Sequence, residues 1–559
     1  MKTDGFRLWL FTALLAGGCI AAEAALTNSW IDGTGKWESG SNWSLGVAPS
    51  TNGQPSIVIT NAGGNVVTID ATTVLSNAIN GCLSVSDLTV SSNTLQLINA
   101  GAATPLEISR INIISFRVST GSTVVIRNSF LRTRTTTTVD GSLLLDGGLL
   151  IGTNSATAAT LYVGLSTPAS VTVSNGTMVT DNSRILSGSF SMAGGTNIVE
   201  GYFENFSSTL INGGIVICTN AFTAVRSPGQ TTVSNGTMVA SSLEVGIAYN
   251  QSGTFTLAGG SVDAAGMYLG GGYDITTPIT GTVWIVGSAA VLTVTNGTTT
   301  IGSDEGNCFP PCTGVGRLTV SNGIWRARDV EVGSATNSQG TLTVAGGFVT
   351  VSSNLTIGAC TAGGGTGVVT VAGGNLLVTN STHNGTIFVR NGKLVMAGGF
   401  LQADTILITN SCAQFVRTGG TLVYSNAVLN ANDDTDGDGI PNGFDVAPLD
   451  PANAFNDSDG DGLTDLQEYV AGTNPTNSAS AFRVTSITQV NSTNILITWM
   501  TGINKTNALE KVAGGMGSFT NNFATMFIVT NTVGTTTNHV DVGAIGANPA
   551  RYYRVRLVP

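Results

Sequence analysis

Hydrophobic and polar residues alternate in short runs over most of the chain between about residues 75 and 430. Alternation with a period of two predicts β-strands that bury one face. The runs are separated by Asn-Gly or Gly-Gly dipeptides, where glycine can adopt the positive φ that a tight turn requires. The octapeptide Thr-Val-Ser-Asn-Gly-Thr-Met-Val shows the unit, since it spans Thr172 to Val179 and recurs unchanged from Thr232 to Val239. The chain is therefore predicted to repeat a strand–turn–strand unit.

The length of the repeat identifies the architecture. The second residues of these turn dipeptides are glycines at positions 176, 195, 214, 236, 260, 297, 323, 347, 374, 399 and 420. Successive steps are 19 to 27 residues long, except for a step of 37 from Gly260 to Gly297. A period of this size is too short for a propeller blade and fits one rung of a β-solenoid. We expect the long step to contain an extra rung, carried by residues 281–286.

The pattern predicts an all-β protein whose residues 75–430 form a right-handed parallel β-helix. Stacked rungs would bury Val, Leu and Ile, and would place Thr, Ser and Asn on the outside. The alternative is a series of β-sandwich modules, which would need repeats several times longer. Alternating strands return in residues 479–559, for example at 494–499 and 551–557. This last region resembles a small fibronectin-type-III β-sandwich with Trp499 in its core.

Charge is concentrated in one part of this weakly charged chain. Only 10% of the 559 residues are charged, against about 25% in typical globular domains. With 42% hydrophobic residues, the composition also excludes a disordered chain. Eleven of the 33 acidic residues lie between Asp433 and Glu468, and this segment accounts for the net charge of −11. Nucleic acid is not an expected partner, because no basic stripe is interleaved with aromatic residues.

The acidic segment, residues 431–478, carries a calcium-loop pattern twice. In the second copy, oxygen donors fall at positions 1, 3, 5, 9 and 12 of a twelve-residue loop, the carbonyl of Leu463 is at position 7, and Gly462 at position 6 permits the sharp turn. These donors are Asp457, Asp459, Asp461, Asp465 and Glu468. The first copy provides Asp434, Asp436, Asp438 and, at its twelfth position, Asp445. We predict that both copies bind Ca²⁺; the alternative is an acidic disordered linker.

The same residues carry a family resemblance. Residues 433–475 resemble bacterial thrombospondin type 3 repeats, which implies a calcium-stabilised structure rather than catalysis. A short helix is expected after Leu463, ended by Gly472 and Pro475. Near the N-terminus, the tryptophans at 30, 37 and 43 with nearby Gly and Pro resemble the start of autotransporter-type passenger regions in bacterial surface proteins. We interpret residues 25–74 as a packed cap in preference to a carbohydrate platform.

The N-terminus is typical of an exported protein. Lys2 and Arg7 precede an apolar run, and Ala22-Glu-Ala24 fits a signal-peptidase site, so residues 1–24 are predicted to be a signal peptide. A lipidated Cys19 is the alternative. The mature chain is expected to be secreted or displayed at the cell surface, without a membrane span.

Export makes disulfides possible, and one pair of cysteines has suggestive spacing. Cys308 and Cys312 flank two prolines, which favours a tight loop closed by a local disulfide. Cys82, Cys218, Cys360 and Cys412 are expected to be small buried hydrophobic residues instead.

The sequence favours a structural or adhesive protein whose partners are polysaccharide or extracellular matrix components. The alternative is a polysaccharide lyase or glycoside hydrolase, because parallel β-helices often carry these enzymes. Glycoside cleavage needs two facing carboxylates. The acidic groups at 200–204, 304–305 and 326–331 are interpreted as surface charges or ion pairs. A row of arginines could bind an acidic polysaccharide or simply form a polar face: Arg110, Arg117, Arg127, Arg132 and Arg134.

Overall fold

A computed structural model gives the fold of two compact units. It describes residues 26–558 except 51–54, 78–81, 102–105, 111–113, 155, 157, 225–228, 248–251, 272–278, 303–313, 360–363 and 547–549. The first unit runs to Gln414 and includes Thr418–Ala427; the second contains Phe415–Arg417 and the chain from Val428 onward. Among the described residues, no helix has the length and hydrophobicity needed to cross a membrane.

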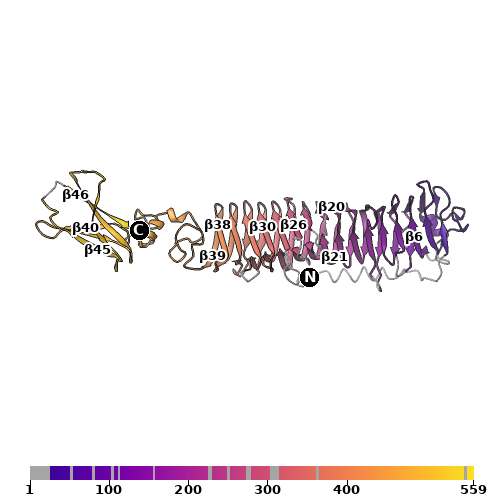
Figure 1. The fold of residues 1–559 in the computed structure, drawn as a ribbon. Helices are drawn as coiled ribbons and strands as arrows, with labels where there is room; N and C mark the ends of the chain where they lie inside the picture. The colour runs from indigo at the N-terminus through magenta and orange to yellow at the C-terminus, as the bar shows by residue number, and fades with distance from the viewer. Residues whose placement is uncertain are drawn as a thin grey trace. The chain divides into compact units, whose positions relative to one another are not determined.

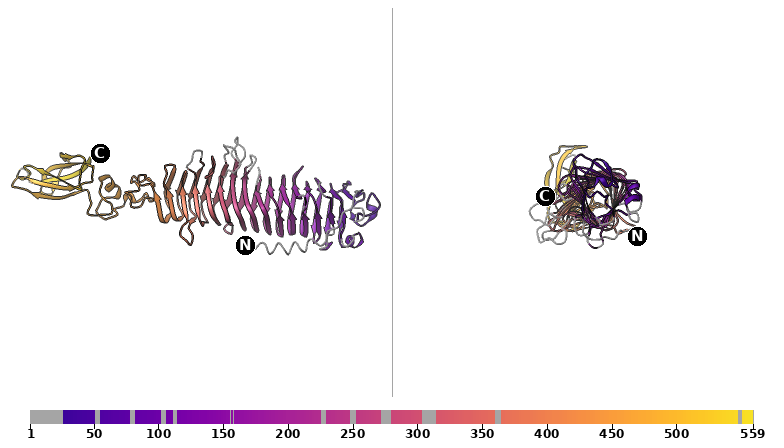
Figure 2. Two further views of the ribbon diagram at one scale, coloured as in Figure 1. Left: turned by 90° about the horizontal axis from the view of Figure 1, so that it is seen from below. Right: turned by 90° about the vertical axis from the view of Figure 1, so that its right-hand side faces the viewer.

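Strands β1 to β39 form one sheet in which neighbouring strands are parallel, and we call this sheet the parallel stack. Each strand pairs with a strand about 20 to 35 residues away, so that the strands of successive rungs lie side by side (Figures 1 and 2). The pairings run in three series, one for each side of a rung. This all-β arrangement of many parallel strands fits the β-solenoid expected from the repeat length.

The first series contains β2 (Gly35–Lys36), β4 (Val66–Ile69), β7 (Thr94–Ile98), β10 (Thr123–Arg127), β13 (Ser142–Gly152), β15 (Ala169–Thr180), β17 (Gly188–Met192), β20 (Ser208–Ile211), β22 (Gln230–Val233), β24 (Gly253–Leu257), β26 (Ile279–Ile285), β28 (Gly314–Val320), β30 (Gln339–Val344), β33 (Thr366–Val371), β36 (Gly392–Met396) and β38 (Ala413–Arg417). The second contains β5 (Ser84–Val85), β8 (Leu106–Ile108), β11 (Phe130–Thr133), the ends of β13 and β15, β18 (Thr196–Val199), β21 (Ile215–Ala224), β23 (Thr237–Ile247), β25 (Ser261–Gly271), β27 (Val291–Ile301), β29 (Ile324–Val332), β31 (Phe348–Val351), β34 (Asn375–Val378), β37 (Phe400–Ile408) and β39 (Thr421–Leu429). The third contains β1 (Thr27–Ser29), β3 (Ser56–Ile59), β6 (Asp87–Val90), β9 (Phe116–Val118), β12 (Thr137–Val139), β14 (Thr160–Val163), β16 (Asn182–Ile185), β19 (Phe203–Asn205), β32 (Asn354–Ile357), β35 (Thr386–Val389) and the ends of β21, β23, β25, β27, β29 and β37.

Parallel pairing begins earlier than the expected boundary at residue 75. Strands β3 and β4 already pair with β6 and β7, so the predicted cap contributes rungs of its own. The alternating signal in each of these strands is only four residues long, although Gly63 and Gly64 form a turn with positive φ between them. Trp30, Trp37 and Trp43 are at most 2% exposed and contact one another edge to face. Their burial supports a packing role for the three rings. The 3₁₀ turn η2 (Gly40–Asn42) and the helix α2 (Ala71–Asn77) belong to the same region.

Glycine recurs because the turns of successive rungs stack on one another. Gly260 has a φ of 71°, and a Cβ built there would lie 2.2 Å from the carbonyl oxygen of Gly236 in the rung before. The same close approach joins Gly347 to Gly323, at 2.4 Å, and Gly399 to Gly374, at 2.2 Å. A side chain at these turns would therefore push two rungs apart.

We expect Gly347→Ala to weaken the rungs around it more than Gly121→Ala does. Both glycines have positive φ, at 66° and 74°, but only Gly347 has backbone within contact distance of an added Cβ. Overpacking of this kind costs about 1–3 kcal/mol beyond the strain of the positive φ itself. Hydrogen exchange of the β30 and β31 amides measures the effect, and equal changes in the two variants would contradict it.

The strand expected at residues 281–286 is present as β26, but Gly297 does not mark a rung of its own. Strand β26 pairs with β24 and with β28, while β27 pairs with β25, so the interval contains one stacked turn between Gly260 and Gly297 and one rung fewer than expected follows before Gly323. Gly287 occupies the stacked turn of this rung, with an added Cβ 1.7 Å from Ala258 O. Gly297 lies instead beside a break in register within β27, where Val294 and Thr298 are successive paired residues. The sequence pattern was misread because Asn-Gly occurs at two different places in a rung.

The second unit contains two antiparallel sheets that share a core. One contains β40 (Val484–Gln489), β41 (Ile495–Met500) and β45 (Thr536–Asp541), and the other contains β42 (Thr506–Gly515), β43 (Ser518–Phe519), β44 (Ala524–Val529) and β46 (Ala550–Val558). Ile497 and Trp499 from the first sheet pack with Leu509 from the second. The 3₁₀ turn η3 (Asn453–Phe455) and helix α3 (Asp465–Ala471) precede these sheets.

The cysteines follow the expectation only in part. Cys218 is buried and free, as predicted, whereas Cys412 is exposed and Cys82 is disulfide-bonded, so that the prediction is wrong for these two. The predicted pair Cys308 and Cys312 lies outside the described residues, as do Cys360 and the predicted signal peptide.

Candidate metal centre

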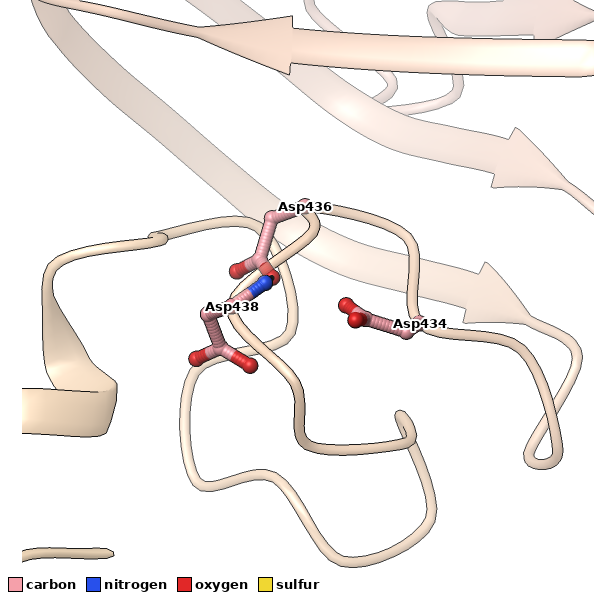
Figure 3. A group of neighbouring side chains, drawn as sticks. All are labelled: Asp434, Asp436 and Asp438. Atoms are coloured by element: carbon pink, nitrogen blue, oxygen red, sulfur yellow. Dashed lines mark hydrogen bonds between the residues drawn. The ribbon is translucent and has the colours of Figure 1, made fainter. Parts of the chain in front are cut away.

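The two acidic loops place three aspartates at matching positions. Asp434, Asp436 and Asp438 each lie 23 residues before their counterparts in the second loop, Asp457, Asp459 and Asp461. In each loop, one carboxylate oxygen from every aspartate lies within 4.8 Å of the others. Figure 3 shows the carboxylates of the first loop directed toward a shared space. Like charges at this separation repel one another unless a cation or protons lie between them.

The backbone of each loop folds around its first aspartate. In the first loop, the N–H groups of Gly437 and Gly439 donate to the two oxygens of Asp434, at 2.8 and 2.9 Å. In the second loop, the N–H groups at 460 and 462 donate to the oxygens of Asp457, at 2.7 and 2.8 Å. All four donors are glycines with φ between 78° and 98°, a range that most other residues avoid. Glycine is therefore required at both places of each loop.

Each of the other two aspartates in a loop has one carboxylate oxygen without a hydrogen-bond partner. Asp459 Oδ1 accepts the N–H of Asp461 at 3.2 Å, and Asp461 Oδ1 accepts the N–H of Leu463 at 2.9 Å. Their Oδ2 atoms are buried and accept no hydrogen bond, and the same is true of Asp436 Oδ2 and Asp438 Oδ2. A buried carboxylate oxygen without a partner costs free energy, which bonding to a cation would recover.

The twelfth position of each loop adds further oxygens without partners. Glu468 on α3 is 0% exposed, and neither of its carboxylate oxygens accepts a hydrogen bond. Asp445 accepts bonds from Ala447 N and Asn453 Nδ2 through Oδ1, at 2.8 and 2.6 Å, while its Oδ2 is buried and unpartnered. An all-oxygen set of carboxylates with a twelfth-position acid fits the preference of Ca²⁺ for six to eight hard ligands.

The expected helix after Leu463 is present and fixes the position of Glu468. Thr464 and Gln467 form a capping box at its N-terminus, with each side chain bonded to the backbone N–H of the other. Gly472 ends the helix with a φ of 71°. The expected short helix and its stop at Gly472 are therefore confirmed, whereas the capping box was not predicted.

The ninth residue of each loop also contacts the second residue of that loop. Both oxygens of Asp465 accept hydrogen bonds from Ser458, Oδ1 from its N–H at 3.1 Å and Oδ2 from its hydroxyl at 2.7 Å. In the first loop, Asn442 Oδ1 accepts the N–H of Thr435 at 3.2 Å, and Asn442 Nδ2 donates to the hydroxyl of Thr435 at 2.8 Å. The ninth residue therefore helps to close each loop.

The carboxylates are costly to ionise in the absence of a cation. Burial, together with the charges of Asp438 and Asp445, raises the pKa of Asp436 to about 7. Burial likewise raises the pKa of Glu468 to about 7, with added repulsion from Asp459 and Asp461. Protons and a metal ion therefore compete for the same oxygens near neutral pH.

Several acidic residues of the described parallel stack are engaged by ion pairs or hydrogen bonds. Glu204 pairs with Arg184, Asp329 pairs with Arg328, and Glu331 accepts the hydroxyl of Ser334. Three members of the arginine row are also paired: Arg110 with Asp87, Arg127 with Asp146 and Arg134 with Glu107. The acidic pair at 304–305 lies outside the described residues.

The comparisons with known proteins match the second loop to a known family of repeats. The model of the bacterial TSP3 repeat family matches residues 457–478, which include the second loop and α3. Repeats of this family bind calcium. A search of curated proteins and a search of solved structures find no significant match. The protein thus combines a large parallel stack with a segment that contains a bacterial TSP3 repeat. The first loop lies outside the match, but it reproduces the hydrogen bonds of the second.

Proposed function

We propose that the protein is a secreted or surface-displayed structural protein with adhesive contacts to polysaccharide or matrix. In this proposal the parallel stack is a right-handed β-helix that serves as a stalk. The acidic segment binds Ca²⁺ at both loops, and the two antiparallel sheets form a fibronectin-type-III-like terminal module. The opening tryptophans belong to an autotransporter-like passenger start, and residues 1–24 direct export.

One observation carries the calcium part of the proposal. Seven buried carboxylate oxygens without hydrogen-bond partners gather in two loops that share the same internal bonds. They belong to Asp436, Asp438, Asp445, Asp459, Asp461 and Glu468. Extracellular calcium modules often bind with a Kd of about 10⁻⁴ to 10⁻³ M, so the loops would fill outside the cell and stay empty inside it. The proposed export would therefore place the loops where the calcium concentration is high enough for them to bind.

Two measurements test the adhesive function. Protease added to intact producing cells should digest the protein, because it is exposed outside the cell. The purified chain should be retained by insoluble polysaccharide or matrix without releasing reducing sugar, because several acidic groups of the described stack, such as Asp87, Asp146 and Glu204, are engaged in ion pairs. Protection from protease in intact cells would contradict export, and release of sugar would assign the stack to an enzyme.

A further inference from the structure

One side of the parallel stack has an unusually uniform surface. In the first series, the outward positions from β15 to β26 align in two columns through the strand register. We call these twelve positions the hydroxyl face. Its members are Ser170, Thr172, Ser189, Ser191, Ser208, Leu210, Gln230, Thr232, Thr254, Thr256, Thr282 and Trp284. Rungs repeat at about 4.8 Å and outward positions on one strand lie about 6.6 Å apart, so the hydroxyls form a regular grid.

The hydroxyls of this face are available to a ligand. All of the side chains on it are half-buried or exposed, while the residues between them on each strand are buried. Among the described side chains, Ser170 is the one member of the face that shares a hydrogen bond within the protein, with Ser142 at 2.9 Å. Each remaining hydroxyl can both donate and accept a hydrogen bond outward.

The absence of charge restricts the kind of partner. No member of the hydroxyl face is charged, and charged residues of the same rungs lie on the other two series. Examples are Arg184 and Glu244 on the third series and Asp263 on the second. The face ends at β26, because the next rung places the exposed Arg317 beside Thr282 in the same column. Over its twelve positions the face offers no opposite charge to a phosphate or carboxylate polymer, whose desolvated charges would be left unpaired. It suits an uncharged ligand that is itself rich in hydroxyls.

Trp284 adds an apolar platform to the grid. Its side chain is 41% exposed and stands between Thr256 and Thr319 in the neighbouring rungs. Tryptophan is highly buried on average, and it is enriched at the centres of binding sites. A flat ring beside hydroxyl groups matches a sugar ring, which has an apolar C–H face and a polar edge. The raised indole also breaks the flatness that a planar solid surface would require.

We propose that the hydroxyl face binds an extended, uncharged polysaccharide, with Trp284 stacking on a sugar ring and the Ser and Thr columns bonding to its hydroxyls. A chain lying along the stack meets the same pair of side-chain positions once per rung, so contacts accumulate with length. This inference rests on the proposed adhesive function and assigns that function to one surface of the protein.

Affinity electrophoresis of the full-length protein in gels containing a soluble uncharged β-glucan, or an acidic alginate, tests the inference. The wild-type chain should be retarded by the uncharged polymer and not by the acidic one. Trp284→Thr, which extends the threonine column, should weaken retardation at least about tenfold. Thr256→Lys should weaken it similarly by introducing a charge. Thr300→Lys, the same change on the third series, is the matched control and should behave as wild type.

The outcomes distinguish a wrong assignment of the binding surface from a wrong proposal of adhesive function. Retardation that is unchanged in Trp284→Thr and Thr256→Lys would overturn the assignment to this face while leaving adhesion in place. Equal retardation by alginate would overturn the choice of an uncharged partner. Binding to none of the insoluble polysaccharides or matrices would remove the adhesive function and the inference with it. Inhibition of ice growth without retardation would assign the grid to ice and overturn the proposal.

Discussion

Chelation of calcium is expected to open the segment between Leu429 and Ser478 to protease while the parallel stack stays intact. Without metal, the carboxylates of each loop lie within a few ångströms of one another, and several of their oxygens are buried without partners. Coordination would replace this repulsion and fix both loops against α3. At a hundredfold excess of calcium over the dissociation constant, the linkage adds about 2.7 kcal/mol to the stability of the segment.

Limited proteolysis of the full-length protein with and without chelator measures this effect. The double variant Asp436→Asn with Asp459→Asn should mimic chelation, because it removes one carboxylate with an unpartnered oxygen from each loop. Asp433→Asn is the matched control: it removes the same charge from an exposed residue next to the first loop. Cleavage of the control at the rate of the double variant would show that charge alone matters, and no effect of chelator would leave the segment as an acidic linker.

Trp499→Ala is expected to be the most damaging single substitution in the second unit. Trp499 is 0% exposed and packs with Ile497 and Leu509 between the two sheets. Replacing a buried tryptophan by alanine costs about 3–5 kcal/mol through lost packing and the cavity that remains. The indole N–H is itself buried without a partner, so its removal recovers part of that cost and places the loss near about 3 kcal/mol.

Hydrogen exchange of the β41 and β42 amides in the full chain reports this loss without assuming that both units unfold together. Met516→Ala, at a side chain that is 93% exposed, is the control and should change stability by no more than about 0.5 kcal/mol. If these amides exchange as slowly in the tryptophan variant as in the control, Trp499 does not belong to the stabilising core of the second unit.

Local requirements of the fold could be predicted from the sequence. A glycine at each stacked turn is required by backbone contact with the rung before, so the repeat appears directly as a glycine period. The calcium loops were visible for the same reason, because ligand spacing and turn glycines lie within twelve residues. Gly297 shows where this prediction from the glycine period fails. Its Asn-Gly dipeptide lies at a register break within β27 and not at a stacked turn, so counting it as a turn predicted one rung too many.

Contacts between distant residues could not be predicted. Arg110 pairs with Asp87 and Arg127 with Asp146, one rung away in each case, and nothing in either local sequence indicates the partner. Asn453, which donates to Asp445, follows it by eight residues and belongs to no loop motif. The hydrogen bonds of Asp465 to Ser458 could not be predicted either, because the pattern records a carboxylate at the ninth position and not the serine that contacts both of its oxygens.

Isothermal titration of the full-length protein with calcium tests the central claim most directly. The two loops share their ligand positions and internal bonds, so the account predicts saturable binding at two sites with a Kd of about 10⁻⁴ to 10⁻³ M. Asp436→Asn should remove the first site and Asp459→Asn the second, whereas Asp433→Asn should retain both. A titration without saturable heat, or one that is unchanged in the double variant, would contradict the account.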